Sequence, residues 1–169
     1  NALVITVAAA GSSSNAIGGN LGAIVMKNRS NALIGKQVSI TADGNVTVKA
    51  LQNSELYLIA ASAAVSGSRT AAGGTLNVTV NGTEANVTVN DGATIRSEKG
   101  SVVLNADTKE KLISVLASAS AALGGTGAAG VLSVLVSGSK TVTDIGKVTI
   151  YAKKDFIFHN FHTIGHCHI

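Results

Sequence analysis

The sequence predicts an all-β protein, a parallel β-solenoid assembled from about three imperfect repeats of about 55 residues. Three observations lead to this fold class: an alternation of apolar and polar residues with a period of two, a long-range repeat marked by glycines, and a composition almost without aromatic residues. The alternation is clearest between Ala71 and Ala106. It is typical of strands, in which successive side chains point to opposite faces of the sheet.

Residues 76–81 alternate Leu or Val with Asn or Thr, and residues 86–90 repeat this pattern around Val87 and Val89. We therefore expect Leu76, Val78 and Val80 to face the interior, with the polar residues between them in solvent. On this interpretation, replacing Val78 by Asp would bury an unpaired charge and unfold its repeat.

Turn dipeptides interrupt the alternation at Asn81-Gly82, Asp91-Gly92 and Lys99-Gly100. Gly accepts positive φ, and Asn or Asp bonds to its own backbone, so such pairs favour turns. Asn81-Gly82 between two alternating runs is also a hairpin signal, and an antiparallel meander is the main structural alternative. The long repeat favours the solenoid.

The repeat is seen when Gly19, Gly74 and Gly130 are superposed at offsets of 55 and 56 residues, each followed by an alternating apolar run. Residues 44–50 match residues 100–106 at an offset of 56, which predicts a one-residue insertion near Gly92. The third copy is expected to be shortened around residues 138–144. A unit of this size cannot bury its apolar face alone, and stacking of the copies would bury it.

Composition limits the function classes. Aromatic residues make up 3% and charged residues 13% of the chain, so the core must consist of small aliphatic side chains. The net charge of +4 is scattered, without basic runs or interleaved aromatics, so no nucleic-acid binding is expected. Charged side chains are expected at corners and on outward positions, namely Arg96, Glu98, Lys99, Lys109, Glu110 and Lys111.

A change of composition divides the chain into a solenoid segment, residues 1–152, and an atypical His/Phe-rich tail, residues 153–169. All three Phe, all four His and the single Cys lie in this tail. His159, His162, His166, Cys167 and His168 offer enough donors for Zn²⁺ or Ni²⁺, but their spacing matches no closed zinc motif. We assign no metal site.

An enzyme of the polysaccharide-acting β-helix type would need two carboxylates a few ångströms apart. Asp43, Asp91, Glu98 and Asp107 are available, but Asp43 and Asp91 directly precede turn glycines, and residues 1–152 contain no His to act as a base. The glycine-rich segments lack the order of phosphate or dinucleotide loops. We therefore predict no catalytic residues, no cofactor-binding residues and no cofactor.

One stretch suggests a membrane segment instead. Residues 112–138 contain no charge, a length that would suit a membrane span or hairpin. Gly124 with Ala128 and Gly125 with Ala129 have the small-xxx-small spacing of packed membrane helices. Against this, the equivalent stretches carry charges nearby, and residues 132–136 align with a polar-faced strand in the second copy.

Residues 61–106 and 31–50 together resemble the repeats of large bacterial filamentous adhesins, which are haemagglutinin-like or leukotoxin-like surface proteins and include autotransporter passengers. The resemblance covers about residues 2–152. It implies a right-handed parallel β-helix, exported across the cell envelope and displayed extracellularly or on the bacterial outer-membrane surface. The expected function is that of a structural stalk or adhesive segment without catalytic activity.

The resemblance also implies partners: neighbouring repeats of a longer chain, and glycans or matrix proteins of host or bacterial surfaces. A binding alternative places a glycan platform on outward rows of polar residues, namely Asn77, Thr79, Asn81, Asn86, Thr88 and Asn90. Uncapped terminal repeats would expose strand edges, so we also expect end-to-end association of the isolated segment.

Overall fold

The computed structural model describes the backbone of residues 1–168 and the side chains of residues 1–160, and in this part of the chain all regular structure is β-strand. The chain winds through three coils, each of which contributes a long strand, a second long strand and a short one, and β10 begins a fourth coil. The strands are β1 (Ala2–Ser12), β2 (Ala16–Ile34), β3 (Ser39–Ala42), β4 (Val46–Ser66), β5 (Thr70–Val89), β6 (Thr94–Ser97), β7 (Val102–Ala122), β8 (Thr126–Ile145), β9 (Thr149–Ala152) and β10 (Phe156–His168).

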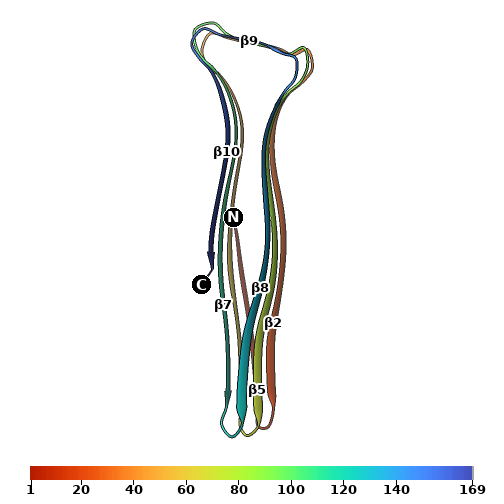
Figure 1. Cartoon of the computed structure of the whole chain (residues 1–169), viewed down its shortest axis with the longest axis vertical. Helices are drawn as coiled ribbons and strands as arrows, with labels where there is room; N and C mark the ends of the chain where they lie inside the picture. The colour runs from red at the N-terminus through yellow and green to blue at the C-terminus, as the bar shows by residue number, and fades with distance from the viewer. Residues whose placement is uncertain (169) are drawn as a thin grey trace.

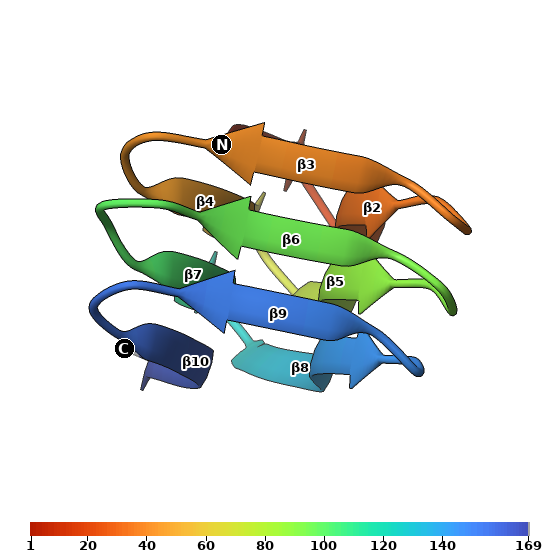
Figure 2. The ribbon, with the colours of Figure 1, turned by 90° about the horizontal axis from the view of Figure 1, so that it is seen from above.

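Every strand pairs in parallel with its counterpart in the next coil, which confirms the solenoid and excludes the antiparallel meander. Three sheets result, with strand orders β1-β4-β7-β10, β2-β5-β8 and β3-β6-β9. Figure 1 shows the first two sheets as long facing walls, closed at one end by the short strands and at the other by tight bends. Seen from above, each coil turns in the right-handed sense (Figure 2).

The pairing confirms the repeat that marks the sequence. Gly19 lies beside Gly74 and Gly74 beside Gly130, while Val46 lies beside Val102 and Ala50 beside Ala106. The two length changes, however, lie elsewhere than expected. The inserted residue lies in the bend 98–101 between β6 and β7, because β3 and β6 still pair at an offset of 55 and β4 and β7 at 56.

The third coil is likewise not shortened at residues 138–144, because β8 pairs with β5 without interruption from Thr126 to Ile145. Its missing residue lies in the bend 146–148. The equivalent bends of the first two coils each contain a residue with positive φ, Gln37 at 57° and Gly92 at 76°. The third coil makes this corner with one residue fewer.

The interior changes along the length of the walls. At the end closed by β3, β6 and β9, three sheets surround an apolar core in which Val87, Ile95 and Leu104 are completely buried. Toward the opposite end the walls converge (Figure 1), and there the buried apolar cluster consists of Ala16, Ala64 and Ala71. A Cβ on Gly73 would lie only 2.8 Å from the carbonyl oxygen of Ala119, so small residues are what allows this close approach.

The inward and outward faces of β5 contradict part of the sequence interpretation. No turn occurs at Asn81-Gly82, because β5 is one strand from Thr70 to Val89. Val87 and Val89 face inward as expected, and strict alternation then turns Leu76, Val78 and Val80 to the outer face. Asn77, Thr79 and Asn81, expected in solvent, are instead at most 2% exposed.

Residues 156–168 continue the stack, because β10 pairs with β7 from Phe156 beside Val102 to His168 beside Ser114. The compositional boundary after Ala152 coincides with the bend between β9 and β10. Phe156 and Phe158 lie at the level of the inward residues Val102 and Leu104 of the coil before.

Two aspartate substitutions on β5 test the assignment of its faces. Val87→Asp should lower the free energy of unfolding by about 3 to 5 kcal/mol, because it places an uncompensated charge in the apolar core. Val78→Asp, the matched control on the outer face, should cost only about 1 kcal/mol, the range of strand propensity. Chemical denaturation of both variants measures the difference, and a larger loss for Val78→Asp would show that the faces are reversed.

Candidate functional site

The outer face of the β2-β5-β8 wall carries a charged depression of about 430 Å³. Gly82 and Gly138 form its floor, since neither contributes a side chain, and the surrounding charged residues are Lys27, Arg29, Glu84 and Lys140. These positions come together because the sheet is in register: Lys27 lies beside Gly82 and Gly82 beside Gly138. The depression is therefore made by equivalent positions of all three coils.

The electrostatics of this depression leave an excess of positive charge. Glu84 accepts a hydrogen bond from Asn86 Nδ2 at 2.8 Å and forms an ion pair with Arg29. The hydrogen bond from Asn86, together with Arg29 and the positive charge of Lys140, lowers the pKa of Glu84, so this carboxylate stays ionised near neutral pH. Three cations and one anion surround the floor, which makes the depression suited to an anionic group.

The polar platform predicted from the sequence is divided by the structure. Asn86, Thr88 and Asn90 are on the outside. Asn86 Nδ2 also donates a hydrogen bond to Asn31 Oδ1 of the neighbouring coil at 3.1 Å. Asn77, Thr79 and Asn81 are inside and cannot contact a ligand on the surface of the folded chain. Only the half of the platform near residues 86–90 is therefore accessible.

A buried carboxylate, Glu110, lies where the interior changes from apolar to polar. Expected on the surface, Glu110 is 4% exposed, and its oxygens accept hydrogen bonds from Asn81 Nδ2 at 2.6 Å and Ser139 Oγ at 2.8 Å. Ser137 Oγ donates to the same carboxylate, and the Thr83 hydroxyl lies 2.8 Å from Ser139 Oγ. This network joins the two walls across the interior, since Asn81 belongs to β5, Ser139 to β8 and Glu110 to β7.

Alternation along β7 could have located Glu110. It shares its parity with Val102, Leu104, Ala106 and Leu112, all of them buried. The sequence suggested an outward position for Glu110 because its neighbours Lys109 and Lys111 are charged. Those two lysines do lie on the outer face, and hydrogen bonding to the Tyr57 hydroxyl raises the pKa of Lys111.

The four carboxylates considered for glycoside hydrolysis have separate partners. Asp43 pairs with Lys99 of the next coil at 3.1 Å, and Asp91 Oδ1 accepts the backbone N–H of Lys147 at 2.7 Å. Glu98 forms an ion pair with Arg96, and Asp107 lies 3.9 Å from Lys109. Asp43, Asp91 and Glu98 lie in bends, whereas Asp107 is on β7.

The donors of the His/Cys tail fall mostly beyond the described side chains. Among these donors, His159 is described and exposed, whereas His162, His166, Cys167 and His168 lie outside the side chains that the structure describes. Elsewhere in the described residues no cluster of three or more His, Cys, Asp or Glu could hold a metal ion.

The uncharged stretch from residue 112 to 138 is strand, bend and strand, made of the end of β7 and the start of β8, and so it is not the helix that membrane-type packing motifs suggested. In the described part of the chain, no helix has the length and apolar character to span a membrane.

Replacement of Glu110 tests the interior network. Glu110→Ala should lower the free energy of unfolding by about 1 to 3 kcal/mol, because it leaves buried donors such as Asn81 Nδ2 without an acceptor. Glu55→Ala, at an outward-facing position of β4 in the second coil, is the control and should stay within about 0.5 kcal/mol of the parent. Equal losses in thermal or chemical unfolding would contradict the network.

Comparison with known proteins finds no relative: no family model, no curated protein and no solved structure matches the chain.

Proposed function

We propose that this chain is a non-catalytic stalk or adhesive segment of an exported bacterial surface adhesin of the filamentous haemagglutinin-like type. The resemblance of residues 31–50 and 61–106 to the repeats of such proteins supports this proposal. The fold is compatible with it, because a parallel solenoid can be lengthened by adding coils without changing those already present.

The observation that carries the proposal is the set of side-chain bonds that join equivalent positions of successive coils. Ser62 Oγ donates to Ser118 Oγ at 3.0 Å, the hydroxyls of Thr83 and Ser139 lie 2.8 Å apart, and Lys99 pairs with Asp43 at 3.1 Å. Such bonds occur inside the stack, on its walls and at its corners. They supplement the backbone ladders against forces that would separate one coil from the next.

Surface accessibility tests the proposed location. Antibodies raised against the whole chain should label intact cells that produce it, and brief treatment with an external protease should remove the label. An antibody against a cytoplasmic protein of the same cells is the control for membrane integrity. Labelling that appears only after permeabilisation would contradict display at the cell surface.

A second candidate function, binding of acidic glycans, is favoured by the charged depression around Lys27, Arg29 and Lys140. Sulfate or carboxylate groups of a surface glycan would complement its excess positive charge. The same wall continues with the exposed Asn31 and the half-buried Asn86 and Thr88, which offer further hydrogen-bonding groups.

Charge reversal in the depression tests this binding function. On an array of sulfated and sialylated glycans at low salt, the parent chain should give a signal that falls at least fivefold with Lys140→Glu, because this change removes the excess charge. Lys153→Glu, in the exposed bend between β9 and β10, makes the same charge change away from the depression and should retain the signal. Equal losses with both variants would assign any binding to net charge alone.

A further inference from the structure

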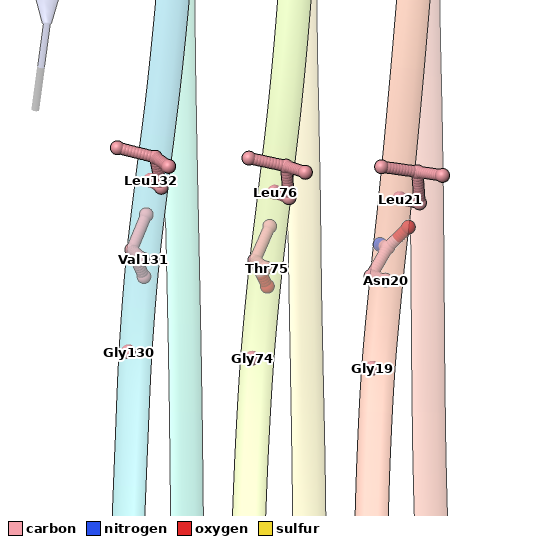
Figure 3. Close-up of a pocket in the computed structure, with 9 residues that line it drawn as sticks. All are labelled: Gly19, Asn20, Leu21, Gly74, Thr75, Leu76, Gly130, Val131 and Leu132. Atoms are coloured by element: carbon pink, nitrogen blue, oxygen red, sulfur yellow. The ribbon is translucent and has the colours of Figure 1, made fainter.

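The outer face of the β2-β5-β8 wall has a second depression, which is apolar and lies nearer the tight bends. Two ladders run across it: Gly19, Gly74 and Gly130 form a furrow, and Leu21, Leu76 and Leu132 form a parallel ridge two residues further along each strand (Figure 3). The volume of the depression is about 570 Å³. Leu21 is 72% and Leu132 59% exposed, so the ridge stands out from the wall.

The chain itself does not require glycine in this furrow. A Cβ at Gly74 or Gly130 would have no atom within 4 Å, and one at Gly19 would have its nearest neighbour at 3.9 Å. None of the three has positive φ, since the only such residues described are Gln37 and Gly92. The neighbouring inward Gly73 is different, because a Cβ there would collide with Ala119. The missing side chains of the furrow therefore keep space open on the outside.

The wall around the ridge and furrow carries no charge. Every second residue within 17–25, 72–80 and 128–136 faces outward, and all of these outward residues are Ile, Leu, Val, Ala or Gly. Charged residues on this face begin only at Lys27, Glu84 and Lys140. Five outward positions on three strands make a flat footprint of roughly 500 Å². An apolar patch of this size is among the largest that monomeric proteins expose, and such patches are often functional.

We propose that this wall binds the same wall of a second copy of the chain, in an antiparallel twofold arrangement centred on Thr75. A twofold axis that lies between the two walls, parallel to the glycine and leucine ladders at the level of Thr75, places the Leu76 side chain of each copy over Gly74 of the other. It also places Leu21 over the second copy's Gly19 and Leu132 over its Gly130. Each ridge then fills the opposite furrow, which is the self-complementarity that a twofold interface requires.

The size of the contact is sufficient for this arrangement. Two flat footprints amount to roughly 1,000 Å², before the relief of the side chains is added, and this reaches the area expected of a specific interface. No charged group of the wall would be buried in the contact. A lipid surface would accept the same apolar residues, but it would gain nothing from matching each leucine ladder to a glycine ladder.

Exchanging ridge and furrow in the middle coil tests the proposal. Sedimentation equilibrium of the whole chain should show a dimer whose Kd rises at least tenfold with Gly74→Leu, because two leucines then meet, and also with Leu76→Gly, which removes the ridge. The double variant, Gly74→Leu with Leu76→Gly, restores one leucine facing one glycine and should recover the parent Kd within about threefold.

Controls separate this interface from other associations. Gly138→Leu makes the same substitution at another open glycine of the wall and should leave the Kd unchanged. If Gly74→Leu lowers thermal stability, Leu76→Asp on the outer face provides an independent disruption. The proposal would be overturned if the parent chain were monomeric, or if it associated through its strand edges with a Kd that none of these variants changed. It would also be overturned if the double variant failed to recover the parent Kd, or if all variants bound lipid vesicles equally well.

Discussion

The architecture depends on one constraint, the strict alternation of side chains along strands of about 20 residues that have no bulge or turn. Once Val87 and Val89 enter the apolar core, every odd-numbered position of β5 is committed to the interior, down to Thr75 and Asn77. The even-numbered Leu76, Val78 and Val80 must then face outward. The free energy gained by burying apolar side chains at the end closed by β3, β6 and β9 thus determines which residues of β5 face inward at the opposite end, where the walls converge. It does so even where local hydrophobicity would favour the opposite orientation.

The end at which the walls converge tolerates this assignment because its interior offers partners to several of the buried polar donors. Thr75 Oγ1 donates to Ser62 Oγ at 3.0 Å and Asn77 Nδ2 to Thr79 Oγ1 at 3.3 Å, while Asn81 donates to Glu110. Buried polar groups are costly when they lack partners, and the Oδ1 atoms of Asn77 and Asn81 have none among the described residues. These hydrogen bonds therefore offset part of the cost of burying polar side chains where the walls converge. Small side chains serve the same purpose, since alanine and glycine let the two walls meet without large residues between them.

The sequence was sufficient for the fold class, the repeat length and the register of the glycine and valine ladders, because these depend on periodicity alone. It was insufficient for the direction in which β5 faces, because an alternating pattern has two equivalent polarities and Asn81-Gly82 resembles a turn. Neither signal shows that Asn81 has an acceptor on a strand 29 residues away. The charged depression was also missed, since Lys27, Glu84 and Lys140 come together only through the register of three coils.

The shape of the coil bears on the binding surfaces proposed for its outer walls. Each additional coil advances the stack by only about 4.8 Å, whereas a strand of 20 residues extends a wall by roughly 66 Å. A chain selected only for reach would gain more length per residue from shorter strands. Long strands instead produce broad walls on which every ladder, whether charged at Arg29-Glu84-Lys140 or apolar at Leu21-Leu76-Leu132, repeats once per coil. Repetition multiplies a weak contact along the axis, so a surface of modest strength on one coil becomes a strong one on a stack of many.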